Sequence, residues 1–216
     1  MMKKTVLAMV LAATMVSGCS MIGGSDYSVE NIKEQGDELL TSSTVEVQVV
    51  TDVNGEEKKT LAGYQTSTIK EGEIARLSVN AAFLAAKPVF DKFSARLKED
   101  DKAGRLITLL QNSDDEEATW KSFTKEEQDL VGDFFDSEMM EELMDSMGEV
   151  AQTSALSIGK FMLLDQTKMM SDLPFETAYA EKDLYGHTYD QTVYLKNSVV
   201  KVNDLYVQVQ ALRSFE

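Results

Sequence analysis

The stretch Ser198-Val199-Val200-Lys201-Val202-Asn203-Asp204-Leu205-Tyr206-Val207-Gln208-Val209 decides which fold class this chain predicts. Valines gather before the Asn-Asp pair and apolar residues alternate after it, a pattern typical of two strands joined by a tight turn. The same region also fits a helix, with apolar residues three or four apart at Leu184, Leu195, Val202, Leu205, Val209 and Leu212. Because Val, Thr and Tyr are frequent here and two turn dipeptides interrupt the pattern, we expect strands over about 178–213.

A second strand pair is expected near 44–66. Val45, Val47 and Val49 alternate with polar residues, which is the two-residue period of a half-buried strand. The Asn54-Gly55 dipeptide that follows is a strong hairpin signal, because both residues tolerate a positive φ angle.

Residues 71–172 between these strand pairs predict helices. Apolar residues recur at helical spacing from Ile74 onward, and Pro88 is expected to end or kink this first helix. Thr124 and Glu127 have the spacing of a capping box, so another helix should begin there. The longest helical pattern runs over 137–170, with Asp165 on its apolar side. We therefore expect an α+β fold, with a helical block at about 71–172 packed on an antiparallel sheet; the alternative is an all-α helical bundle.

Composition restricts the function classes more than it selects among them. The chain has 216 residues, a formal net charge of −16, 43% hydrophobic and 27% charged residues. This is globular composition and enough chain for one domain with a sizeable core. Its acidity argues against binding nucleic acid, which requires an excess of Lys and Arg. One cysteine and one histidine argue against a disulfide framework and a His-rich metal site.

The first twenty residues have the layout of an export signal. Lys3 and Lys4 precede an apolar run over 5–16, which is too short to span a bilayer. Small residues then lead to the single cysteine, in the order Val16-Ser17-Gly18-Cys19.

This pattern resembles the signal peptide and lipobox of bacterial lipoproteins. The resemblance implies that Cys19 carries the acyl anchor after cleavage before it, and that Val16, Ser17 and Gly18 fill the lipobox. It further implies, because Ser20 rather than Asp follows the cysteine, sorting to the outer membrane. The expected organisation is a signal peptide at 1–18, a lipidated tether at 19–27 and a single globular domain at 28–216. The domain itself resembles no family that we recognise.

Chemical motifs are sparse, and we expect no catalytic site, no cofactor and no metal. His187 is the only imidazole available for an envelope hydrolase, and we interpret it as a turn or strand residue. The methionines at 139, 140, 144 and 147 suit Cu(I) chemically, but this spacing is more typical of core filling. The acidic runs at 52–56 and 114–117 lack the spacing of a calcium loop.

One motif suggests close packing of helices. Gly148, Ala151, Ala155 and Gly159 put small side chains three or four residues apart, so another helix backbone can approach there. We interpret the stripe as a helix-packing interface, within the domain or with a partner. Together these observations favour an outer-membrane lipoprotein on the periplasmic side that acts as a non-enzymatic interaction or assembly factor, bound to the membrane through Cys19 and to an unidentified envelope protein. The alternative is a carrier or sensor of a small ligand.

Overall fold

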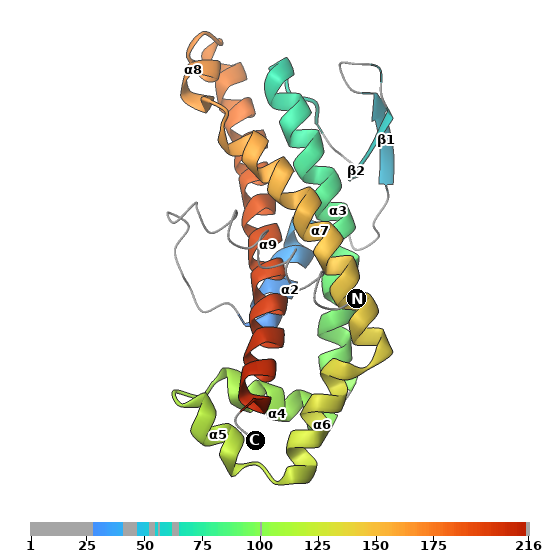
Figure 1. The fold of residues 1–216 in the computed structure, drawn as a ribbon. Coiled ribbons are helices and arrows are strands. Elements are labelled where there is room, and N and C mark those ends of the chain that lie inside the picture. The colour runs from blue at the N-terminus through green and yellow to red at the C-terminus, as the bar shows by residue number, and fades with distance from the viewer. Residues whose placement is uncertain are drawn as a thin grey trace.

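The computed structural model describes residues 28–40, 47–51, 55, 57–61, 65–99 and 101–214. Three long helices, α3 (Lys70–Glu99), α7 (Glu138–Met162) and α9 (Phe175–Arg213), form an elongated bundle in which α7 runs opposite to the other two (Figure 1). Helix α2 (Val29–Leu39) packs against α3 and α9. Helices α4 (Asp101–Gln111), α5 (Glu116–Ser122) and α6 (Lys125–Asp136) cluster at one end, and α8 (Gln166–Ser171) lies at the other.

Aromatic side chains join the long helices. The ring of Tyr194 on α9 meets those of Phe83 and Phe90 on α3, with centroids 5.1 and 6.2 Å apart. Nearer the α8 end, Phe161 of α7 stacks on Tyr185 of α9 at 5.9 Å. All five side chains are buried. Since burying one large apolar side chain contributes about 1.5–3 kcal/mol, these contacts hold α3 and α7 against the part of α9 between Tyr185 and Tyr194.

The predicted α+β fold is wrong, because 178–213 lies within α9 rather than in strands. The alternative helical pattern describes this region correctly, and its residues Leu195, Val202 and Leu205 are buried. Helix α9 contacts α2, α3, α6, α7 and α8, so it is packed on nearly all sides. A helix in this position accepts β-branched residues around its whole circumference, and tertiary packing outweighs their strand propensity.

A two-stranded hairpin accounts for all the sheet structure in the described residues. Strand β1 (Val47–Thr51) pairs antiparallel with β2 (Glu57–Leu61), with Val49 opposite Lys59. Gly55 between them has a φ of 83°, which suits glycine. The hairpin lies beside α3 and provides no layer on which the helices pack (Figure 1).

Two predicted helix boundaries are also wrong. Of the two outcomes predicted for Pro88, an end of the helix or a kink, the end is wrong, because α3 continues through Pro88 to Glu99. Pro88 is exposed, so the backbone hydrogen bond that proline cannot donate is missing on the solvent side of α3. The helical pattern over 137–170 is interrupted after Met162, because the side chain of Asp165 caps a new helix by accepting a hydrogen bond from the Lys168 backbone.

The predicted capping box is confirmed. The Thr124 side chain accepts from the Glu127 backbone N–H, and the Glu127 carboxylate accepts from the Thr124 backbone N–H. Helix α6 therefore begins where the sequence indicates.

Two glycines allow α9 to approach its neighbours closely. A Cβ at Gly72 on α3 would lie 1.4 Å from the Tyr185 hydroxyl oxygen, and one at Gly36 on α2 would lie 2.5 Å from Cε2 of Tyr194. The Lys87 side chain also packs on Gly36, and its Nζ donates to Asp37 at 2.7 Å and to Asp91 at 2.6 Å. Helix α2 is thus fixed by close packing and by a buried ammonium group.

Candidate functional site

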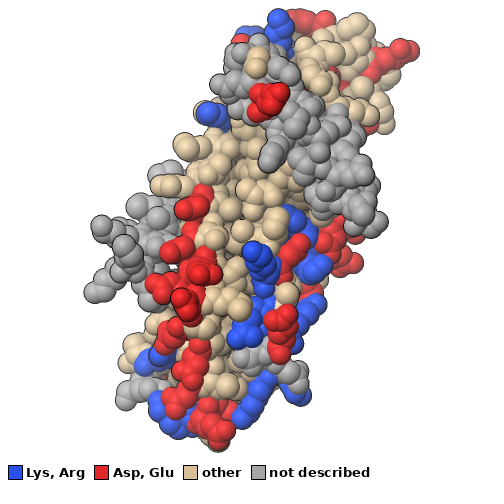
Figure 2. Space-filling model, turned by 90° about the vertical axis from the view of Figure 1, so that its right-hand side faces the viewer, with Lys and Arg blue, Asp and Glu red and all other residues tan. Residues whose placement is uncertain are grey.

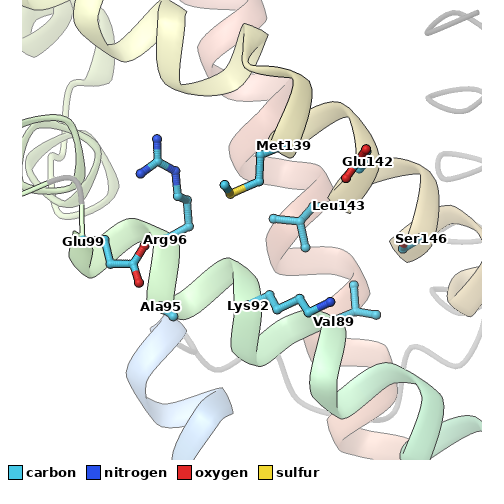
Figure 3. A pocket seen from close by; sticks show the side chains of 9 residues that line it. All are labelled: Val89, Lys92, Ala95, Arg96, Glu99, Met139, Glu142, Leu143 and Ser146. Carbon is cyan, nitrogen blue, oxygen red and sulfur yellow. The ribbon is translucent and has the colours of Figure 1, made fainter.

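An open groove runs between α3 and α7 in the half of the bundle nearer α6. We call it the α3–α7 groove; its volume is about 390 Å³. Figure 3 shows its lining side chains. They are Val89, Lys92, Ala95, Arg96 and Glu99 from α3, and Met139, Glu142, Leu143 and Ser146 from α7.

The groove combines apolar and charged lining. Leu143 is nearly buried, whereas the Met139 side chain is exposed and available to a bound molecule. Arg96 lies over the Phe134 ring, with its guanidinium carbon 5.7 Å from the centroid, which holds the cation in place. Lys92 stands on the α3 wall and Glu142 on the α7 wall, and among the described residues no ion pair joins these two across the opening. The α3 wall therefore carries both signs of charge, with Lys92, Arg96 and Glu99, whereas the only charged side chain in the α7 lining is Glu142.

The α7 wall continues as an acidic row. Between Lys125 and Lys160 the chain has ten carboxylates and no Lys or Arg. Those on the first half of α7 are exposed: Glu138, Glu141, Glu142, Asp145 and Glu149. Figure 2 views the right-hand side of Figure 1 and shows a column of acidic side chains, separated by an uncharged strip from a group that contains most of the visible basic ones. This row is absent from the sites predicted above, although the sequence shows that the 34 residues 126–159 contain no Lys or Arg.

A second open groove, of about 450 Å³, lies between α2, α3 and α4. Its lining includes Val29 and Glu30 at the start of α2, with Leu97 and Lys98 of α3. Both grooves are open to solvent and have mixed polar and apolar lining. Pockets for small ligands are usually lined mainly by apolar side chains and cover most of the ligand surface, whereas these two grooves are open and mixed in lining.

A buried polar cluster, which we call the polar clamp, fixes the chain where it enters α3. Both oxygens of the Glu181 carboxylate accept hydrogen bonds, from the Ser67 hydroxyl and from the backbone and hydroxyl of Thr68, all at 2.7 Å. Glu73 accepts from the Ser67 backbone at 2.8 Å and from Arg76 at 3.0 Å. Burial raises the pKa of Glu181, but the hydrogen bonds from Ser67 and Thr68 outweigh it and hold that pKa below its ordinary value. The groups bind one another, so the clamp attaches the loop to α9.

His187 lies on α9, where its hydrogen-bond contact among the described residues is with Gln191. It is half-buried on α9, and its Nε2 is 3.5 Å from Nε2 of Gln191. Burial lowers the pKa of His187, the Asp190 carboxylate opposes this shift and Arg76 adds to it. Within the described residues no hydroxyl or carboxylate forms a hydrogen bond with the imidazole, as a nucleophile or an orienting group would.

The methionines at the start of α7 are mostly core residues. Met140, Met144 and Met147 are buried and pack in the hydrophobic core, and Met139 alone among the four points into the α3–α7 groove. In the part of the chain that the structure describes, no three His, Cys, Asp or Glu residues are grouped to hold a metal ion. No helix there combines the length and apolarity needed to cross a bilayer.

The stripe predicted to pack helices divides into two parts. Gly148 and Ala151 are buried within the bundle, whereas Ala155 is half-buried and Gly159 is exposed, with open space where its Cβ would be. The first two residues therefore serve contacts inside the bundle, and only the last turns toward solvent.

The lipobox prediction, with Cys19, Val16, Ser17 and Gly18, lies outside the described residues. No family model, curated protein or solved structure matches this chain.

Proposed function

We propose that this protein is an outer-membrane lipoprotein, anchored through Cys19, that acts in the periplasm as a non-enzymatic interaction or assembly factor. The α3–α7 groove is the binding site in this proposal, and its ligand is a basic, partly apolar segment of an envelope protein. The observation that carries the proposal is an open groove with an exposed methionine beside the acidic row of α7. The stretch of sequence that contains this row, 126–159, has no Lys or Arg.

Charge and shape together support a peptide ligand. Exposed carboxylates of one sign attract a basic segment and increase its association rate, while apolar contact with Met139 and Leu143 supplies affinity. A groove lined by two antiparallel helices suits an amphipathic helix laid along it.

The position of α2 supports an orientation on the membrane. The start of α2 shares a groove with Ser94 on α3, about 33 Å of helix away from Gly72 at the α8 end. A nine-residue segment over 20–28 reaches about 30 Å when fully extended. An anchor on Cys19 would therefore hold the half of the bundle that contains α4 nearer to the bilayer.

Site-specific photocrosslinking in cells tests the groove directly. A photoreactive residue at Met139 is expected to trap one dominant partner, whereas the same residue at Val207, an exposed position on α9, is not. Replacing Glu141, Glu142 and Asp145 together by Lys should reduce the Met139 adduct by at least about tenfold, because three attractive charges become repulsive. These side chains are exposed, so the fold should tolerate the change.

The membrane anchor is tested with the same adduct. A Cys19→Ala chain exported by another signal should lose the adduct or form less of it. Equal labelling from Met139 and Val207, or an adduct that the three Lys substitutions leave unchanged, would contradict the proposal. A His187→Ala variant should behave as the wild type throughout.

A further inference from the structure

The end of the bundle that contains α8 carries a concentration of exposed apolar side chains. We call it the apolar tip; it consists of Leu156, Met162, Leu163, Phe175 and Tyr179. These are five of the ten large hydrophobic side chains that are exposed among the described residues, at exposed fractions of 69, 39, 88, 84 and 60%. They come from the last turns of α7 and the first turns of α9, which meet α8 at this end (Figure 1).

Nothing in the described part of the chain covers the apolar tip. Helix α8 packs Met169 and Met170 partly against the core, but it leaves these five side chains exposed. Open space at Gly159 extends the uncovered surface along α7. Large apolar side chains left exposed together at one end of a bundle are the kind of surface that marks an interaction site.

We propose that a second copy of this chain docks on the apolar tip. The charge distribution favours this occupant. Two copies that each carry a formal charge of −16 repel one another over most of their surface. At the apolar tip the exposed charges nearly cancel, because Lys160, Lys168 and Lys182 are interspersed with Asp165, Asp172, Glu176 and Asp183. Like molecules therefore approach one another there at the lowest electrostatic cost.

The size of the tip sets the strength of the contact. Aromatic side chains bury about 150–250 Å² each, so Phe175 and Tyr179 at their observed exposure offer roughly 300 Å² together. With the three aliphatic residues the area stays below the roughly 800 Å² per partner of a stable interface. The dimer is therefore weak in dilute solution and forms where the chain is concentrated, as on a membrane surface.

Single cysteines in the full-length chain test the contact in isolated envelopes. Leu163→Cys is compared with Leu109→Cys and Val207→Cys, which place a thiol at exposed hydrophobic positions outside the tip. A short bismaleimide crosslinker should trap a covalent homodimer from Leu163→Cys, and from the two controls no more than from the wild type, in which the acyl anchor blocks the sulfur of Cys19. Adding Phe175→Asp should lower the Leu163→Cys dimer by at least about tenfold.

Other occupants give different results. Equal trapping at all three positions, or a Leu163→Cys dimer that Phe175→Asp leaves unchanged, overturns the proposal. A product that joins Leu163→Cys to a different protein, without homodimer, assigns the tip to that protein. Flotation of a Cys19→Ala chain with phosphatidylcholine vesicles that Phe175→Asp abolishes, again without homodimer, assigns it to a lipid surface. None of these results depends on the α3–α7 groove.

Discussion

Replacing Gly72 by alanine should destabilise the protein, although alanine is the better helix former. The added Cβ would lie 1.4 Å from the Tyr185 hydroxyl oxygen and 2.6 Å from Cζ, so the ring must move. That ring is buried, stacked on Phe161 at 5.9 Å and covered by the Arg76 guanidinium at 5.8 Å from its centroid. Movement therefore disrupts both contacts, each of which contributes about 0.5–1.5 kcal/mol.

The magnitude follows from two opposing effects. Overpacking of a core costs about 1–3 kcal/mol, and the helix preference of alanine over glycine returns at most about 1 kcal/mol. We expect a net loss of about 2 kcal/mol, which lowers Tm by about 4–8 °C in a chain of this size. The matched control is Gly186→Ala on α9, where nothing lies within 4 Å of the new Cβ. This control should gain about 0.5–1 kcal/mol.

Urea unfolding followed by circular dichroism measures both variants under the same conditions. The midpoint should fall for Gly72→Ala and rise for Gly186→Ala. If Gly72→Ala is as stable as the wild type, the close approach of α9 to α3 at this point is not a feature of the molecule. If both variants lose stability equally, the effect is not specific to the Tyr185 contact.

Three further predictions concern other buried or backbone features. Because the pKa of Glu181 is held below its ordinary value of 4.5, the carboxylate stabilises the fold above that pH and less as pH falls; a pH series of urea midpoints should show that Glu181→Gln flattens this decline. Lys87→Met removes the buried charge that binds α2 and leaves partly exposed carboxylates able to rehydrate; we expect a loss of about 1 kcal/mol and faster hydrogen exchange confined to α2. Pro88→Ala restores a backbone donor within α3 at an exposed position; thermal unfolding should show a gain of about 1–3 kcal/mol, and a loss would mean that Pro88 itself packs.

The elements that are encoded locally could be predicted from the sequence. The capping box at Thr124 and the helix that follows it depend on residues three positions apart, and they lie where the pattern indicates. Helix α9 depends on the opposite kind of information. Its Val, Thr and Tyr residues favour strands locally, and only packing against the surrounding helices makes a helix the better solution. The Asn203-Asp204 dipeptide likewise favours a turn when only its neighbours in sequence are considered, yet Asn203 is buried inside α9.

The candidate sites depend on the arrangement of helices even more strongly. Lys92 and Glu142 are 50 positions apart, and only the antiparallel packing of α3 and α7 makes them opposite walls of one groove. Sequence spacing identifies a stripe of small residues on α7, but it does not show that the stripe turns from core to solvent between Ala151 and Gly159.

Helix α9 fixes the distance between the two ends of the bundle. Its 39 residues span about 58 Å in one uninterrupted helix that contains no proline after its start at Phe175. Probes placed near Phe175 and near Arg213 should therefore keep a nearly constant separation, whatever binds at either end. Any signal that passes between the two ends travels as tilt or rotation of a stiff rod, because α9 has no hinge at which the ends could move independently.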